Sequence, residues 1–323
     1  MEFIKVDSNY VSEAVALAMT EYDRECTKCG QLIKSNYKEK LQELIENLFQ
    51  AKYGIMALEK GKLIGYLCFY GPWDGFFGEV KGAFSPLGGS AFTGNDRNKM
   101  ASLLFEKVSE ELIKDEICSM AICIYAHDEE IAKSFVMNGF GIRCSDAIRD
   151  LKVNTYMHMK FDNISFSELE RGKYRDIRLL KVELAKHLSK GPIFLLTRIS
   201  TIEEWLNNDE RRIFVAKENN EIIGYIEVGD EGENFITENK SMRSICGAYF
   251  MKEYRNNEIA ANLLNYICEV LKSEGICHLG VDCETLNPNA LRFWGKYFQN
   301  YTYSFHRRID ERIIGYSKYL DRI

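Results

Sequence analysis

The apolar and polar positions change period several times along the chain. Apolar residues recur at helical spacing in five segments, which predicts amphipathic helices over 9–22, 36–50, 174–189, 201–207 and 258–274. Short apolar or alternating runs separate these helices and predict strands, with hairpins over 55–66 and 213–225 and a buried strand over 276–283. Helices interleaved with strands predict an α/β (α+β) class, with a mixed, mostly antiparallel sheet flanked by helices.

The pattern occurs twice. Ile-Gly-Tyr stands at 64–66 and again at 223–225, an offset of 223 − 64 = 159. Two further pairs follow at nearly the same offset: Ala-x-Leu-Leu at 101–104 and 261–264 (261 − 101 = 160), and Ile-Cys at 117–118 and 276–277 (276 − 117 = 159). Gly-Ala-aromatic also recurs, at 82–84 and 247–249. Several matches at one offset predict a duplicated module. We expect one module over 1–155 and a second over 156–323, with the boundary between 149 and 168.

Composition narrows the possible functions. The 323 residues carry a net charge of −6, and an acidic chain without a basic stripe argues against nucleic-acid binding. No apolar segment reaches the roughly 20 residues of a membrane helix, and the start has no signal-peptide pattern. We therefore expect a cytoplasmic protein with reduced cysteines and no membrane partner. Cys26 and Cys29 form the only CxxC, without a second pair at metal-site spacing, so no metal is expected.

The segment from Phe250 to Ala260 is the strongest candidate for chemistry. A predicted strand runs into a tight loop, and the loop opens the best-patterned helix. The first N–H groups of a helix lack intrahelical partners, and the helix dipole favours an anion there. The segment therefore suits a pyrophosphate, although every strand-to-helix turn offers part of this.

This segment resembles the GNAT superfamily of acetyl-CoA-dependent N-acetyltransferases. The superfamily pattern is a strand, then Val-x-Pro-x-Tyr-Arg-x-x-Gly-Ile-Ala, then a helix with Leu-Leu, and seven positions here are in register: Phe250, Tyr254, Arg255, Ile259, Ala260, Leu263 and Leu264. The segment from Asn287 to Trp294 is similar to the later Asn-x-x-Ala-x-x-x-Tyr element. The chain as a whole looks like a bacterial tandem-GNAT group, which implies two GNAT-like modules.

The resemblance implies acetyl-CoA as co-substrate and a set of site residues. The cofactor-binding candidates are Phe250, Met251, Arg255, Asn256, Asn257, Glu258, Ile259, Ala260, Asn287, Asn289 and Trp294. Backbone N–H groups near Phe250 or Met251 are expected to polarise the thioester carbonyl. Asp282 and Glu284 alternate with apolar residues and so share one face of their strand, and Glu284 is the first choice as base.

The chain departs from the family pattern at three positions. Glu258 replaces the loop glycine, Lys252 replaces the loop proline, and Trp294 replaces the tyrosine that protonates the departing thiolate. Trp cannot supply that proton, so Tyr297, one turn along, is the substitute candidate. The first copy has a longer loop over 85–99 and Phe135 at the tyrosine position, so it is expected to be diverged and possibly inactive.

Alternative interpretations stand beside these. Arg255 can be a surface residue, Asn287 a helix cap, Glu284 a salt-bridge partner and Trp294 a core residue. The expected function is an N-acetyltransferase acting on a primary amine of a small molecule or peptide, with a homodimer possible. The alternatives are a non-catalytic CoA-binding or ligand-sensing protein, and a first copy that serves only as a scaffold for the acceptor cleft.

Overall fold

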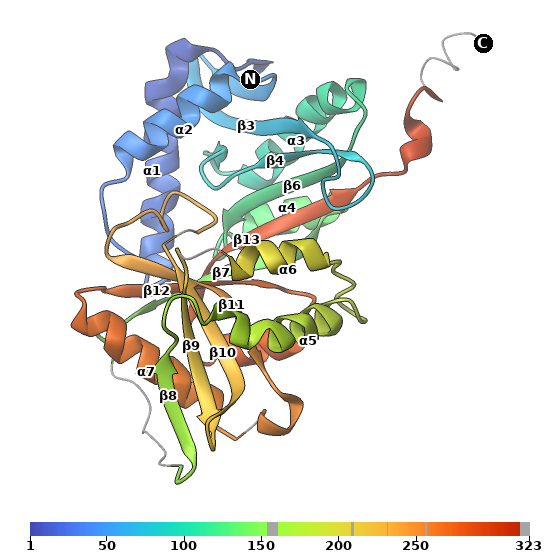
Figure 1. Ribbon diagram of the computed structural model, residues 1–323. Coiled ribbons are helices and arrows are strands. Elements are labelled where there is room, and N and C mark those ends of the chain that lie inside the picture. The colour runs from blue at the N-terminus through green and yellow to red at the C-terminus, as the bar shows by residue number, and fades with distance from the viewer. Residues whose placement is uncertain (154–160, 208–209, 231, 256, 317–323) are drawn as a thin grey trace. The chain divides into compact units, whose positions relative to one another are not determined.

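The computed structural model describes residues 1–153, 161–207, 210–230, 232–255 and 257–316. The chain divides into two compact units, and Figure 1 colours the chain from its N-terminus (blue) to its C-terminus (red). The first unit comprises Met1–Ser145 with Asn300–Ile323, and the second comprises Asp146–Gln299. Apart from one short extra strand, each unit follows the same order of strand, two helices, three strands, helix, strand and helix. This confirms the duplicated mixed α/β module.

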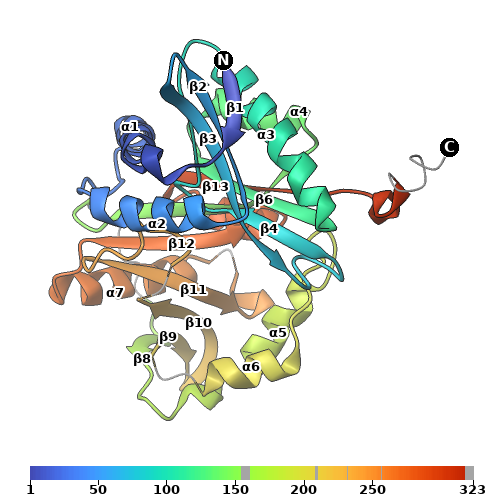
Figure 2. The same ribbon diagram turned by 90° about the horizontal axis from the view of Figure 1, so that it is seen from above.

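The first unit is a mixed sheet with helices on both faces. Its strands, in spatial order, are β1 (Glu2–Lys5), β2 (Tyr53–Glu59), β3 (Lys62–Trp73), β4 (Lys81–Ser85), β6 (Ile117–Tyr125) and β13 (Gln299–Arg308), with β5 (Ser90–Phe92) paired to β3. Only β4 and β6 are parallel among the pairs described. Figure 2 shows two helices on each side of these strands: α1 (Val11–Lys28) and α2 (Lys38–Gln50) against α3 (Arg97–Lys114) and α4 (Glu129–Met137).

The second unit repeats this arrangement. Its strands are β8 (Ile164–Glu168), β9 (Arg212–Glu218), β10 (Glu221–Gly229), β11 (Met242–Phe250) and β12 (His278–Glu284), next to which lies β7 (Gly141–Asp150). Its helices are α5 (Arg178–Leu188), α6 (Ile199–Leu206), α7 (Ile259–Ser273) and α8 (Pro288–Trp294). One apolar core joins the sheet to α7 and α8, and a second joins it to α5 and α6. Over both units, the described residues also form four 3-10 segments: Ser8–Tyr10, Tyr174–Ile177, Lys252–Tyr254 and Glu311–Ile313.

The last strand of each unit is not the one that chain order predicts. Strand β13 follows the second copy, yet it pairs antiparallel with β6 of the first unit, and its Phe305 is fully buried in the first unit's core. The division between the units falls inside β7, whose Ala147 packs in the second unit's core. The expected modules 1–155 and 156–323 therefore differ from the compact units at both ends.

The two units differ in how their parallel strands separate. In the first unit β4 stays paired with β6 to its last residue, where Ser85 lies opposite Ile122. In the second unit the pairing of β11 with β12 ends at Ile245 opposite Val281, although β11 continues to Phe250. The second unit therefore has a fork between its two parallel strands, which is where a ligand can enter a sheet.

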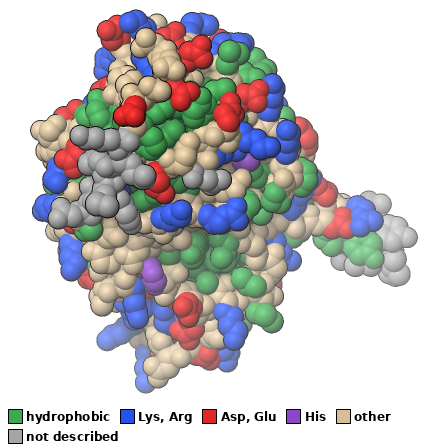
Figure 3. Space-filling view, turned by 90° about the horizontal axis from the view of Figure 1, so that it is seen from below, with side chains coloured by type: hydrophobic (Ala, Val, Ile, Leu, Met, Phe, Trp, Pro, Cys, Tyr) green, Lys and Arg blue, Asp and Glu red, His purple; other side chains and the backbone are tan. Residues whose placement is uncertain are grey.

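Neither the surface view nor the cysteines indicate a particular function. Figure 3 shows basic, acidic and apolar side chains intermixed on the face that it draws. All ten cysteines are free thiols. Among the described residues, no helix combines the length and the apolar character that crossing a bilayer requires.

Candidate functional site in the second unit

The fork begins at a β-bulge. The register of β11 against β10 shifts at Cys246, after which Gly247 lies opposite Glu227 and Tyr249 opposite Tyr225. The N–H of Met251 donates to the carbonyl of Ile223 at 3.0 Å. Since hydrogen-bonding direction alternates along an antiparallel strand, the N–H groups of Ala248 and Phe250 point away from β10, into the fork.

The loop after β11 is held in place by its own side chains. The Nε of Arg255 donates to the carbonyl of Phe250 at 2.9 Å, and its guanidinium stacks 4.9 Å from the ring of Tyr249. The hydroxyl of Tyr254 donates to Glu218 on β9 at 2.6 Å. The loop is therefore fixed to the sheet, with the charged end of Arg255 at the start of α7.

The start of α7 is not capped by a side chain. Glu258 is the N-cap residue, its φ of +64° lies in the left-handed region, and its side chain accepts no capping hydrogen bond. The first N–H groups of this 15-residue helix are thus available to an external acceptor. The left-handed backbone explains why the family pattern has glycine at this position.

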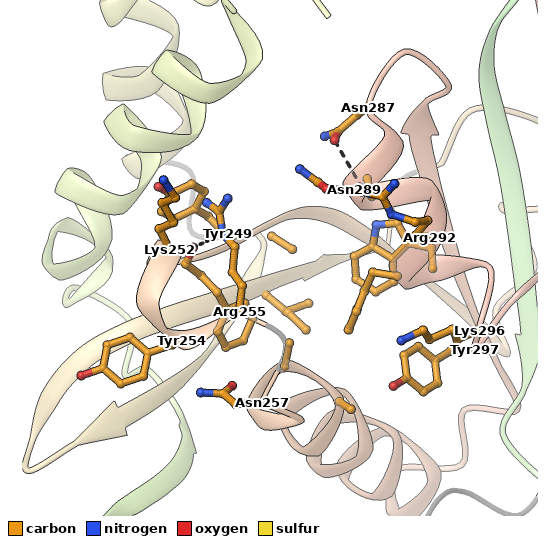
Figure 4. Close-up of a pocket in the computed structure, with 18 of the residues that line it drawn as sticks. Tyr249, Lys252, Tyr254, Arg255, Asn257, Asn287, Asn289, Arg292, Lys296 and Tyr297 are labelled. Carbon is orange, nitrogen blue, oxygen red and sulfur yellow. Dashed lines mark hydrogen bonds between the residues drawn. The ribbon is translucent and has the colours of Figure 1, made fainter. Parts of the chain in front are cut away.

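These features border one pocket of about 660 Å³, drawn in Figure 4. Lys252, Tyr249 and Arg255 stand on one side of it, and Asn287, Asn289 and Arg292 on α8 or its N-cap stand on the other. Its charged lining side chains, apart from His187, are Lys252, Arg255, Arg292, Lys296 and Glu258. Four cationic groups against one carboxylate make the pocket suited to an anionic ligand.

The pocket gathers most of the residues predicted from the sequence. The predicted residues that line it are Phe250, Arg255, Asn257, Glu258, Ala260, Asn287, Asn289, Trp294 and Tyr297. Met251 and Ile259 are not among its lining residues: the N–H of Met251 is bonded within the sheet, and Ile259 is buried in the core. Asn256 lies outside the described residues.

The aromatic residues of α8 divide between core and pocket. Trp294 is 7% exposed and packs in the core, with its ring 4.8 Å from Phe293 and 5.6 Å from Phe298. Tyr297 is less buried, and its ring lies 5.1 Å from that of Phe293. Trp294 thus has the core role weighed from the sequence and also contributes to the pocket wall. Tyr297 lies in the turn that follows α8, and its phenol side chain lines the pocket.

The two candidate bases on β12 do not line the pocket. Asp282 and Glu284 lie on the face of β12 opposite to Val281 and Cys283, which pack toward the α7 core. Asp282 is the first β12 residue beyond the last pair with β11, so it stands at the mouth of the fork. Burial among protein atoms raises the pKa of Asp282 to about 7, and the nearby carboxylates of Asp146, Glu233 and Glu284 act in the same direction. Part of its side chain nevertheless stays open to solvent.

Several lining residues were missed by the sequence interpretation. Lys252 was noted only as the replacement for a proline, and Tyr249, Arg292 and Lys296 were not considered. Helical spacing offered a signal for α8, because Asn289 and Arg292 are three residues apart and share a face, and their side chains hydrogen-bond at 2.7 Å.

Helix α5 contributes Leu184 and His187, which no motif indicates. The helix is anchored by Lys181, whose ammonium lies 2.6 Å from the carboxylate of Glu227 on β10. Both side chains are at most 4% exposed. Removing one partner of such a buried pair leaves an uncompensated charge, so the pair fixes where α5 meets the sheet.

No cluster of three or more His, Cys, Asp or Glu side chains with metal-site geometry occurs in the part of the chain that the structure describes.

Comparisons with known proteins agree with this geometry. Residues 182–298, which include the pocket, match the sequence model of the acetyltransferase (GNAT) family. A GCN5-related N-acetyltransferase from Sphaerobacter thermophilus has a similar structure, with a TM-score of 0.61, 14% identity and 95% of each chain covered. A GCN5-related glucosamine N-acetyltransferase region of a fungal GH3 β-N-acetylglucosaminidase matches with a TM-score of 0.54 and 13% identity, over 94% of this chain and 38% of that one. No curated protein sequence matches the chain.

The structural likenesses show the fold. The family match covers the part of the second unit that carries the fork, the loop and α7. Residues 182–298 of the second unit thus match the GNAT family by sequence, and the chain as a whole, with its two units of like element order, has the same fold as the Sphaerobacter structure.

Proposed function

We propose that the protein is an acetyl-CoA-dependent N-acetyltransferase whose second unit binds the co-substrate and transfers its acetyl group to a primary amine. The observation that carries this is one pocket bordered by the opened strands, the uncapped start of α7 and the Arg255 guanidinium. Anions bind at helix starts through free N–H groups and the helix dipole. The donor set therefore fits a pyrophosphate.

The positions of the basic side chains indicate where each phosphate of the co-substrate binds. Arg255 and the first-turn N–H groups of α7 are placed to hold the pyrophosphate, with Asn257 beside them. Lys252, Arg292 and Lys296 supply further positive charge along the pocket for the remaining phosphate. Glu258 opposes this, because its carboxylate lies at the same helix start.

Acetyl-CoA supplies a thioester carbonyl, which an amine attacks to form an amide and release the thiol. The N–H groups of Ala248 and Phe250 point into the fork and can donate to the oxygen on which negative charge develops. Asp282, at the mouth of the fork, is the carboxylate placed to accept the amine proton. Glu284, the first choice from the sequence, lies two residues farther along the same face. Tyr297 is the candidate proton donor to the thiolate.

The experiment that tests the function combines binding and turnover. Calorimetry with CoA is expected to show binding, and incubation of acetyl-CoA with a panel of small-molecule and peptide amines is expected to release free thiol. Arg255→Ala should weaken both at least tenfold, because a charge-assisted contact to a phosphate is lost. Arg175→Ala is the matched control, since Arg175 is exposed and paired with Glu203 away from the pocket. Absence of CoA binding at millimolar concentration would exclude the proposal.

Two observations favour a second candidate, a CoA-binding protein without transferase activity. Glu258 puts a carboxylate where the family pattern has glycine, and buried Trp294 replaces the tyrosine. CoA binding that is weakened by Arg255→Ala, without thiol release from any amine of the panel, would select this candidate.

A further inference from the structure

The first unit also has an arginine at the turn that opens its corresponding helix, although Arg97 begins α3 whereas Arg255 lies four residues before Ile259, the first residue of α7. Arg97 is the first residue of α3, the helix that corresponds to α7 in element order. Its Nε donates to the carbonyl of Phe92, five residues earlier, at 3.0 Å. The Nε of Arg255 likewise donates to the carbonyl five residues earlier. Both guanidiniums are therefore held at the turn that opens the helix.

The charged end of Arg97 is fully engaged by the protein. Its NH1 and NH2 groups donate to the two oxygens of Asp128 at 3.1 and 2.5 Å, and NH2 also donates to Glu21 on α1 at 2.5 Å. All three side chains are at most 14% exposed. One turn along α1, the buried carboxylate of Glu25 is hydrogen-bonded to Nδ1 of His127 at 2.7 Å. Helix α1 and the turn before α4 thus close over the start of α3.

One residue of this closure has a direct counterpart in the second unit, where its side-chain chemistry differs. Asp128 and Asn287 are 159 residues apart, the offset of the repeat (287 − 128 = 159), and each caps its helix by accepting the N–H of the residue three positions on. Asp128 carries a charge that binds Arg97, whereas Asn287 is neutral. Among the described residues Arg255 has no ion pair, and it faces Asn287 across the pocket (Figure 4).

We propose that Glu21 and Asp128 take the place of a ligand phosphate on Arg97, so that the first unit binds no acyl-CoA and the chain binds one. The continuous pairing of β4 with β6 supports this independently, because it leaves no fork for the rest of the ligand. The choice of ligand rests on the proposed function of the second unit. The ion cluster of Arg97, Glu21 and Asp128 is a property of the first unit alone.

The test is best made at pH 8. Burial raises the pKa of Glu21 to about 7, against the opposing effect of Arg97 and Arg24, so the Glu21 carboxylate is mostly ionised at pH 8. Calorimetry of the full chain with CoA is expected to give one equivalent bound. Arg97→Gln should leave affinity and stoichiometry unchanged, whereas Arg255→Ala should weaken binding at least tenfold. Asn287→Asp, which copies Asp128 into the second unit, should weaken binding about fivefold or more.

A second measurement does not depend on the ligand. Urea unfolding of Arg97→Gln, Asp128→Asn and the double variant should give shifts in midpoint that are not additive, because each single change already breaks the pair. Two equivalents of CoA, or loss of binding in Arg97→Gln, would overturn the inference. Additive unfolding shifts would overturn it as well. No CoA binding together with non-additive shifts would instead exclude the proposed function and leave the ion cluster established.

Discussion

At the scale of single residues, Glu258 is unfavourable in two respects: its backbone conformation and the charge of its side chain. Its φ of +64° costs a residue with a side chain about 1–2 kcal/mol, and its carboxylate stands at a site for an anion. Glu258→Gln and Glu258→Gly should both tighten CoA binding about fivefold, corresponding to about 1 kcal/mol between charges a few ångströms apart in a wet pocket. Only the glycine variant removes the backbone strain, so it should resist urea better than the glutamine variant.

Calorimetry and urea unfolding check this prediction. Glu253→Gln is the matched control, because Glu253 is exposed in the same loop and does not line the pocket. Unchanged CoA affinity in both Glu258 variants would mean that the carboxylate points away from the bound phosphates.

The pH dependence of turnover tests which carboxylate is the base. A carboxylate accepts a proton only when ionised, and the pKa of Asp282 is raised to about 7. We therefore expect kcat/KM to rise with pH up to about 7 and then level off. Asp282→Asn should lower kcat about 100-fold or more and abolish this rise. Glu284→Gln should keep it. A profile that loses its rise in Glu284→Gln alone would return the role to Glu284.

At the scale of elements, Gly224 shows how β10 supports the pocket. Gly224 lies opposite Phe250, and a Cβ there would come within 2.2 Å of the Phe250 ring. Gly224→Ala should push this buried ring into the pocket, lower the free energy of unfolding by about 1–3 kcal/mol and weaken CoA binding.

Gly65 provides the control, because it occupies the same Ile-Gly-Tyr position in the first unit. A Cβ on Gly65 would meet Met100 and a backbone oxygen at 3.2 Å, and neither Gly65 nor Met100 lines the pocket. Gly65→Ala should therefore leave CoA affinity unchanged, whatever it costs in stability. Equal effects of both variants on CoA binding would contradict the role given to Phe250.

The predictability of these elements from sequence has a physical limit. Local periodicity located α2, predicted over 36–50 and observed at Lys38–Gln50, and α7, predicted over 258–274 and observed at Ile259–Ser273. A helix is set by contacts a few residues apart, so its pattern is visible in one segment. Strand partners are set by contacts far apart in sequence, so neither the end of pairing at Ile245 nor the partner of β13 could be predicted.

The candidate site shows the same limit. Arg255 stands at a fixed position of the family motif and Asn257 at a variable one, and both line the pocket. The direction of the Met251 N–H depends on the register with β10, which the motif does not contain. His187 comes from a helix whose placement depends on the buried pair of Lys181 and Glu227, which is a long-range contact. Motif positions were therefore predictable, while side chains brought in by packing were not.

At the scale of the whole molecule, the order of the strands along the chain does not match the division into two compact units. Phe305 on β13 is fully buried opposite Ile122 of β6, although it follows the second copy in sequence. Phe305→Leu leaves a cavity in the first unit's core, and truncation of a buried aromatic side chain costs up to about 3–5 kcal/mol. Hydrogen exchange should therefore show lost protection in β4 and β6, with β11 and β12 unchanged.

Leu279→Ala on β12 is the reciprocal change, since Leu279 is fully buried in the second unit's core opposite Arg243 of β11. It should expose the amides of β11 and β12 and spare those of β6, and it should weaken CoA binding, which Phe305→Leu should not. If Phe305→Leu instead removed the hydrogen-exchange protection of β12 before that of β6, β13 would be stabilised by the copy that it follows in sequence. The two folding units would then coincide with the two copies of the repeat. Loss of hydrogen-exchange protection in β6 of Phe305→Leu would instead mean that each unit takes its last strand from the other half of the chain. Neither copy of the repeat would then form a complete sheet when expressed alone.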